Sequence, residues 1–155
     1  MNLKQGIGAA IVIAAAAGLW WIGRAPGPGE AVPRAMTSTD LGRIAAGAAI
    51  VAPALPARLS AEAEAGRVLF EANCIACHGR NAAGVNGSGP PLIHKIYEPS
   101  HHADYAFVLA VTQGVRAHHW PFGDMAPVAG LTQEDALLIA AYVRDVQRAN
   151  GIGVK

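Results

Sequence analysis

The chain has 155 residues, enough for one domain with an appendage. Its twelve Lys and Arg nearly balance its eleven Asp and Glu, so it lacks the excess of positive charge with which a nucleic-acid-binding protein neutralises phosphates. Its two cysteines, Cys74 and Cys77, are too few for a disulfide framework or a four-thiolate zinc site.

The first predicted element is a membrane-spanning helix near the N-terminus. Residues 6–23 are uncharged, and as a helix they would extend roughly 27 Å, close to the about 30 Å of the hydrocarbon core. Trp20 and Trp21 lie near the end of this run, where indole rings favour the membrane interface. We therefore expect residues 1–23 to anchor the protein in the cytoplasmic membrane, with the rest of the chain in the periplasm. The alternative is a cleaved secretory signal and a soluble periplasmic protein, although the cleavage sites after the run are poor.

Residues 24–59 form the expected linker between this helix and a folded domain. They are rich in Ala, Pro and Gly, a composition that favours a semi-extended spacer. Within the linker, residues 41–51 are apolar enough to form a short helix. We assign no function to that helix, which would pack on the domain or on the membrane.

The folded domain is expected to span residues 60–155 and to be all-α. The spacing of apolar residues predicts three main helices, at about residues 60–74, 103–115 and 132–151. Ser60 and Thr132 are the expected N-caps, and acidic residues follow each of them in the first turn, where they suit the helix dipole. No segment shows the clear alternation of a β-strand. The residues expected on the apolar stripes are Ala65, Val68, Leu69, Ala72, Tyr105, Val108, Leu109, Thr112, Leu137, Leu138, Ala141, Tyr142 and Val146.

Long loops rich in Gly and Pro separate the helices, which leaves a thin core for a domain of this size. A bound apolar cofactor would fill that core. The segment Cys74-Ile75-Ala76-Cys77-His78 has the C-x-x-C-H pattern of c-type haem attachment. Its two thiols can reach the two vinyl groups of one porphyrin, and the histidine that follows can then ligate iron. A redox dithiol would need a βαβ context, and a zinc site would need two further ligands spaced near the cysteines, so the pattern favours haem.

Met125 is the predicted sixth ligand of the iron. The other two methionines lie outside the domain, and Met125 sits in a loop among Gly and Pro residues rather than in a helix. A thioether is a soft, weak donor that favours reduced iron. The other interpretation of an isolated methionine is core packing. His118 and His119 are the alternative ligands, because haems with two histidine ligands exist.

These features resemble the class I cytochrome c family, whose members carry one haem, over roughly residues 62–150. The resemblance rests on four segments in the expected order: Ala65-Gly66-Arg67 to Phe70 before C-I-A-C-H-G, then Gly89-Pro90-Pro91-Leu92, then Gln113-Gly114-Val115 before the loop of Met125, and finally Leu131-Thr132-Gln133-Glu134-Asp135 before Ala141-Tyr142-Val143. It implies a cytochrome c-like fold, with about three main helices around one covalently bound haem c, in a membrane-anchored or exported protein.

The resemblance also implies roles for individual residues. Cys74 and Cys77 would bind the haem covalently, and His78 and Met125 would be its axial ligands. Pro90 would offer its carbonyl group to the second ring nitrogen of His78, a bond that fixes the ring and raises its basicity.

Further roles implied by the resemblance concern packing. Leu92 would pack on the haem. Gly66, Phe70 and Tyr142 would form the crossing of the first and last helices, where a glycine lets the two backbones approach closely.

The sequence departs from the family pattern in its histidines. Besides His78 there are five, His94, His101, His102, His118 and His119. They are polar loop residues or, as the alternative, ligands for copper or zinc, because neutral imidazole suits both metals. Trp120 and Arg80 are candidates for hydrogen bonds to a haem propionate, and both could instead be surface or packing residues.

The predicted function is single-electron transfer between respiratory-chain partners, and we expect no enzymatic activity, since nothing resembles a catalytic base beside an open coordination site. The expected partners are redox proteins, such as a terminal oxidase or a quinol-oxidising complex, on the outer side of the cytoplasmic membrane. Residues 60–155 contain seven Lys and Arg against nine Asp and Glu, so steering by net charge should be weak. The alternatives are a haem protein with a histidine-based role in copper or metal handling or sensing, and a fixed subunit of a larger respiratory complex.

Overall fold

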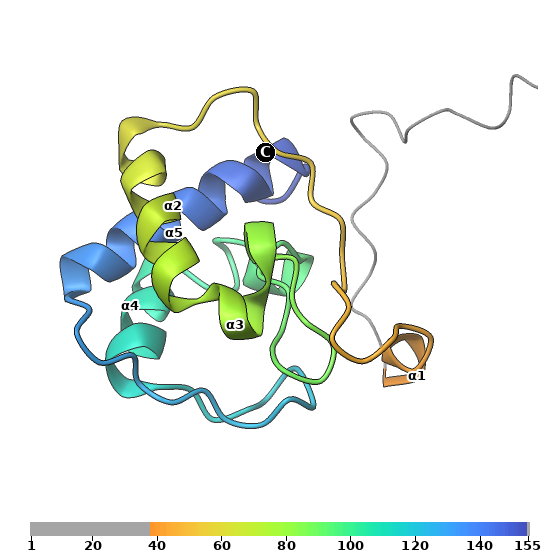
Figure 1. The fold of residues 1–155 in the computed structure, drawn as a ribbon. Helices are drawn as coiled ribbons and strands as arrows, with labels where there is room; N and C mark the ends of the chain where they lie inside the picture. Colours follow the sequence, from red (N-terminus) through yellow and green to blue (C-terminus); the bar gives the residue numbers. More distant parts are fainter. Residues whose placement is uncertain (1–37, 155) are drawn as a thin grey trace, which may run out of the picture. The chain divides into compact units, whose positions relative to one another are not determined.

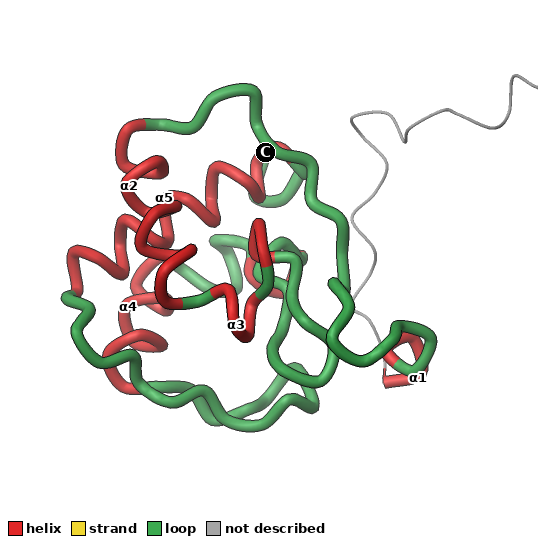
Figure 2. Tube along the Cα trace, in the orientation of Figure 1, coloured by secondary structure: helices red, strands yellow, loops and turns green. Residues whose placement is uncertain are grey.

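The computed structural model describes residues 38–154, and within them the fold is helical (Figures 1 and 2). The helices in chain order are α1 (Ser38–Leu41), α2 (Ala61–Asn73), α3 (Ile75–His78), α4 (Asp104–Gln113) and α5 (Gln133–Ala149), with two short 3-10 turns, η1 (Arg80–Ala82) and η2 (Lys95–Tyr97). The described residues form isolated β-bridges but no strand. The prediction of three main helices is confirmed by α2, α4 and α5, whereas the short α3 was not predicted.

The predicted membrane span, residues 1–23, lies outside the described residues, as does the first part of the predicted linker. Among residues 38–154, no helix is both long enough and apolar enough to cross a membrane.

The long helices α2 and α5 begin at the predicted N-caps. The Ser60 side chain accepts a hydrogen bond from the Ala63 N–H at 3.2 Å. At the start of α5, the Thr132 side chain accepts from the Asp135 N–H at 3.1 Å, and the Asp135 carboxylate accepts from the Thr132 N–H at 2.8 Å, which is a capping box. These bonds hold the pKa of Asp135 below its ordinary value, so its negative charge stays beside the positive end of the helix dipole.

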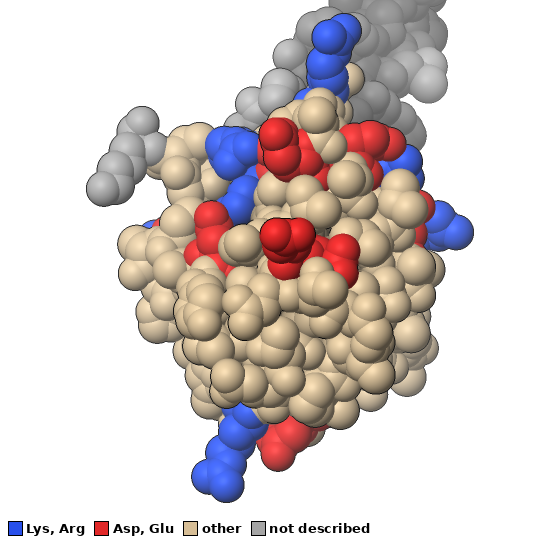
Figure 3. Space-filling view, turned by 90° about the vertical axis from the view of Figure 1, so that its left-hand side faces the viewer, with Lys and Arg blue, Asp and Glu red and all other residues tan. Residues whose placement is uncertain are grey.

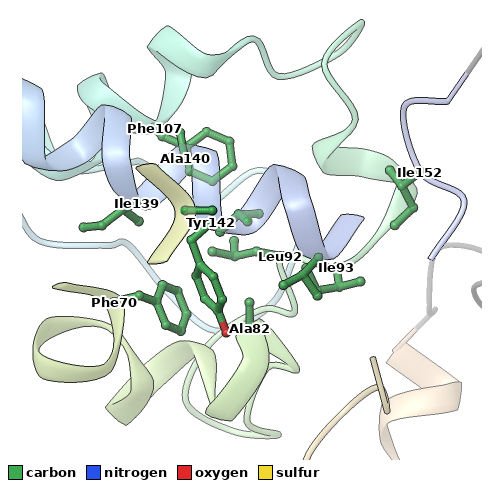
Figure 4. Packing of buried hydrophobic residues seen from close by; sticks show 12 residues of the cluster. Phe70, Ala82, Leu92, Ile93, Phe107, Ile139, Ala140, Tyr142 and Ile152 are labelled. Carbon is green, nitrogen blue, oxygen red and sulfur yellow. The ribbon is translucent and has the colours of Figure 1, made fainter. Parts of the chain in front are cut away.

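Helices α2 and α5 cross at Gly66, and Figure 1 shows α2 passing in front of α5. A Cβ atom on Gly66 would overlap the carbonyl oxygen of Leu138 in α5, so the two backbones approach too closely for any other residue. Beside the crossing, the rings of Phe70 and Tyr142 pack with 5.4 Å between their centroids. Figure 4 shows Tyr142 projecting from α5 between Phe70 and Ala82. The predicted crossing is therefore confirmed.

The buried faces of the helices differ from the predicted apolar stripes. Val68, Tyr105 and Leu137 are 57%, 58% and 47% exposed. The buried apolar residues that the stripes omitted are Ala63, Phe70, Phe107, Val111, Ala136, Ile139, Ala140 and Val143. Helix α2 buries the face that carries Ala63, Gly66 and Phe70, which are spaced three and four residues apart. Because α5 approaches closely at Gly66, this face is the one that is covered, and Val68 is left toward solvent.

The helix predicted at residues 41–51 is absent, and this segment forms turns that pack on the domain. Leu41 and Ile50 are buried, and both pack in one cluster with Trp120. Gly47 adopts a φ of 79°, which a right-handed helix does not allow. Burial against the domain, rather than local helical preference, therefore decides the conformation of this stretch.

We call residues 41–59 the N-terminal strap, because hydrogen bonds tie them to two distant parts of the domain. The Asn86 side chain donates to the carbonyl oxygen of Ile44 at 2.7 Å. Further along, the Asn150 side chain accepts from the Ala54 N–H at 2.9 Å and donates to the Ala54 carbonyl oxygen at 2.8 Å. The described part of the predicted linker is thus bound to the domain.

Two buried polar residues of α5 hold the loop that precedes α4. Arg144 donates to the carbonyl oxygens of Tyr97 and His102 and to the carboxylate of Asp104. Gln147 also donates to the Tyr97 carbonyl oxygen, at 3.0 Å. Because the bonds to Tyr97 and His102 end on backbone oxygens, they fix the path of the loop and the positions from which its side chains extend.

Candidate functional site

The C-x-x-C-H motif lies at the junction of α2 and α3. Cys74 ends α2, where its N–H donates to the Phe70 carbonyl oxygen at 2.8 Å, and it also precedes α3. Cys74 is half-buried, Cys77 is exposed, and both are free thiols. Burial raises the pKa of the Cys74 thiol to about 11, helped by the neighbouring Cys77. Since His78 is the last residue of α3, one helical turn carries two thiols and an imidazole.

The ring of His78 is oriented by the carbonyl group of Pro90. The distance from His78 Nδ1 to the Pro90 oxygen is 2.9 Å, and because a carbonyl can only accept, Nδ1 carries the proton. Nε2 is then the nitrogen with an available lone pair, as a metal ligand requires. Burial lowers the pKa of His78 and outweighs the opposing effect of the Pro90 carbonyl, so the ring is neutral near pH 7. The hydrogen bond implied by the resemblance is present, and the role of His78 toward iron stays a prediction.

A glycine lets the segment that contains Pro90 approach the motif. A Cβ atom on Gly89 would lie 2.7 Å from the Cys77 carbonyl oxygen and 3.0 Å from the Cys77 Cβ. Leu92 is buried in the main apolar core, and its N–H donates to the Ala82 carbonyl oxygen at 2.9 Å. The structure therefore brings the Gly89–Leu92 segment against the motif, and the packing of Leu92 on a haem stays a prediction.

Met125 lies on a different loop, between α4 and α5, and this loop is joined to the end of α4. The Met125 N–H donates to the Val115 carbonyl oxygen at 2.8 Å, and the Val115 N–H donates to the Met125 carbonyl oxygen at 2.9 Å. Gly114 precedes Val115 with a φ of 78°, and a Cβ atom there would overlap the Met125 carbonyl oxygen. This contact was not predicted, although the sequence does place a glycine near the end of the helix predicted at residues 103–115. Together these contacts fix the backbone from which the Met125 thioether extends.

Trp120 contributes a buried donor whose hydrogen bonding is incomplete. The side chain is 8% exposed, and its indole N–H makes no hydrogen bond of normal geometry. The N–H lies near the Tyr97 hydroxyl group: burial raises the pKa of Tyr97, and the indole opposes the rise. A propionate carboxylate would satisfy such a donor. Arg80, the other candidate for this contact, is exposed at the start of η1.

These residues fit a covalently bound haem. Two free thiols and an oriented neutral imidazole share one helical turn, a thioether extends from a loop with a fixed backbone, and a buried indole donor is available for a carboxylate. His94 is buried and packs edge-on against Trp120, with 5.3 Å between the ring centroids. The other four histidines lie together elsewhere on the loops.

Comparison with known proteins identifies the family. The model of the Cytochrome c family matches residues 63–147, which is more than half of the chain and includes the motif, Pro90 and Met125. A search of curated proteins found no match, and neither did a search of solved structures. The chain therefore belongs to the cytochrome c family, as a class I c-type cytochrome that carries covalently attached haem c and transfers electrons through it.

Proposed function

We propose that His78 and Met125 are the axial ligands of one haem c attached to Cys74 and Cys77, and that this centre passes single electrons between respiratory-chain partners. The haem supplies the reversible one-electron change of its iron. The observation that carries the proposal is the 2.9 Å hydrogen bond between His78 Nδ1 and the Pro90 carbonyl oxygen. It fixes both the orientation and the tautomer of the ring, which leaves Nε2 as the ligand atom.

The proposed ligands are both supported by the backbone. Pro90 holds the His78 ring, and the pairing with Val115 holds the backbone of Met125. When side chains fill both axial positions, the metal has no open site at which a substrate could react. We therefore propose a carrier rather than an enzyme.

The proposed partners are redox proteins, such as a terminal oxidase or a quinol-oxidising complex, at the outer side of the cytoplasmic membrane. The uncharged run at residues 6–23 supports this location, since it is long enough to anchor the chain. Figure 3 shows acidic and basic side chains interspersed over the upper part of one face, whereas the rest of that face is mostly uncharged. Such a surface favours short-range contacts over long-range steering, so association should depend only weakly on salt.

The decisive test of the ligand assignment is the substitution Met125→Leu. In the ferric state, methionine coordination gives a weak charge-transfer absorption in the far red. The substitution should abolish this band, open the iron to exogenous ligands and lower the reduction potential, because a thioether stabilises reduced iron. The haem should nevertheless stay on the polypeptide in a denaturing gel, because the thioether bonds of Cys74 and Cys77 do not depend on the sixth ligand.

His118→Ala and His119→Ala are the matched controls, since these residues are the alternative sixth ligands. Both variants should keep the far-red band. If Met125→Leu leaves the spectrum unchanged while one of the histidine variants alters it, the haem has two histidine ligands and the proposed assignment of Met125 is wrong.

A further inference from the structure

Four histidines gather in one cluster although they come from two separate loops. His101 and His102 follow η2, and His118 and His119 lie between Val115 and Met125. The ring centroids are 5.3 Å apart for His101 and His119, 5.2 Å for His102 and His119, and 4.2 Å for His118 and His119. None of these residues belongs to the proposed haem ligands.

Three of the four histidines offer ligand atoms to a common point. One ring nitrogen from each of His101, His102 and His119 lies within 4.8 Å of the other two. A tetrahedral zinc ion with Zn–N bonds of about 2.0–2.1 Å places its ligand atoms roughly 3.3 Å apart. His101 and His119 are exposed. Rotation about their side-chain bonds can therefore bring the ring nitrogens from within 4.8 Å to the spacing that zinc requires, without moving the core.

The cluster is anchored from both loops. His102 Nδ1 lies 2.7 Å from the Ile96 carbonyl oxygen, which places the proton on Nδ1 and leaves Nε2 as the ligand atom. Buried Arg144 donates to the backbone carbonyl of His102. On the other loop, His119 directly precedes buried Trp120. Because the core fixes both backbones, the three imidazoles stay close without a ligand between them.

We propose that His101, His102 and His119 form a transition-metal site, separate from the haem attachment motif, that binds one Zn²⁺ or Cu²⁺ ion. Three neutral imidazoles suit these ions, whereas Ca²⁺ and Mg²⁺ prefer oxygen ligands. His118 lies beside the site but outside the group of three, so the fourth coordination position is left to water or to an external ligand. The ion would cross-link the loop after η2 to the loop that carries Met125.

Zinc titration of the full-length, haem-loaded protein tests this site. Zn²⁺ is the probe because it is redox-inert and cannot change the oxidation state of the haem iron. Isothermal titration calorimetry on protein purified in mild detergent, without a histidine tag, should show one Zn²⁺ per chain. Zn²⁺ should also raise the unfolding temperature, since an ion bound only to the folded state stabilises it. His101→Ala and His119→Ala should each weaken binding by at least about tenfold, the scale on which altered metal-site residues act.

His118→Ala is the matched control, because it removes a neighbouring exposed histidine that is not one of the three ligands. It should bind Zn²⁺ with an affinity close to that of the wild type. His102 is kept in all variants because its ring also holds Ile96. The haem absorption spectrum reports whether each variant is folded. If an alanine variant does not show the spectrum of the folded wild type, His101→Gln or His119→Gln is used in its place.

Three results would each overturn the proposal. One is the absence of stoichiometric zinc binding by the wild-type protein. Another is an unchanged affinity in the His101 and His119 variants. The third is a loss in His118→Ala as large as the loss in those variants, which would show that the three named residues are not the ligand set.

Discussion

Two features of the structure require glycine at position 114: a positive φ, which other loop glycines share, and a close contact with the Met125 backbone, which Gly123 in the same loop lacks. Gly114 adopts a φ of 78°, which favours glycine, and it has no Cβ atom to overlap the Met125 carbonyl oxygen. Gly123 shares the first feature, with a φ of 85°, but a Cβ atom there would meet nothing within 4 Å. Contact with Met125 therefore distinguishes Gly114.

Gly114→Ala should impair the binding of Met125 to iron, and Gly123→Ala should not. Both substitutions place an alanine in the left-handed region, at a cost of roughly 1–2 kcal/mol. At Gly114 the new methyl group must also displace the Met125 backbone, which shifts the thioether. The far-red absorption of the ferric proteins should weaken in the first variant alone. An equal loss of this band in both variants would mean that general loop strain, not the contact with Met125, controls the ligand.

The parts of the candidate site that could be predicted from the sequence are those whose functional groups lie close together along the chain. The spacing of Cys74, Cys77 and His78 indicates haem attachment by itself, because neighbouring residues deliver all three groups. Met125 is predicted as a ligand by elimination, because the other two methionines lie outside the domain. The contact of Gly114 with Met125, in contrast, exists only once two loop segments pair, so no local pattern indicates it.

At the scale of elements, Gly66 controls the distance between α2 and α5. In an ordinary helix interior, replacing glycine by alanine stabilises a protein by roughly 0.5–1 kcal/mol. Here the added Cβ atom would overlap the Leu138 carbonyl oxygen, a rigid backbone atom. The cost of this overlap exceeds the gain in helix stability, because overpacking a well-packed interface costs about 1–3 kcal/mol or more.

Gly66→Ala should therefore destabilise the protein, against the usual direction of this substitution. Thermal or denaturant unfolding of the haem-loaded protein would measure the change. Val68→Ala serves as the control, since Val68 lies on the same helix with 57% of its surface exposed, and its unfolding should stay close to that of the wild type. A Gly66→Ala variant as stable as the wild type would show that the crossing can widen freely.

The positions of the helices were predictable, whereas their buried faces were less so. Caps such as Ser60 and the Thr132–Asp135 pair are local signals, and the helices begin where these signals occur. The face that each helix buries depends on which elements pack against it, and in α2 this is the face that carries Gly66, where α5 approaches closely. The turns at residues 41–51 were missed for a related reason, because apolar residues that pack on another part of the chain do not need to form a helix.

At the scale of the whole molecule, the proposed anchor makes a prediction about the mature protein. The full-length chain should sediment with membranes and should begin at or near Met1, because the uncharged run at residues 6–23 would be retained rather than cleaved. A variant that replaces residues 1–23 with a cleavable signal should be soluble and still carry haem. N-terminal sequencing of the wild-type protein decides the question: a soluble protein that begins beyond Ala25 would contradict the anchor.

Because the N-terminal strap packs on the domain, the packed domain extends beyond the residues that the family model matches. The family match, residues 63–147, excludes both Ala54 and Asn150, which bond to each other across the domain. A chimera that transplanted only the matched residues would carry all the proposed haem ligands, yet it would uncover the apolar surface that Ile50 shares with Trp120. A functional transplant of this domain into another protein should therefore include residues 41–59, so that the surface around Trp120 stays covered.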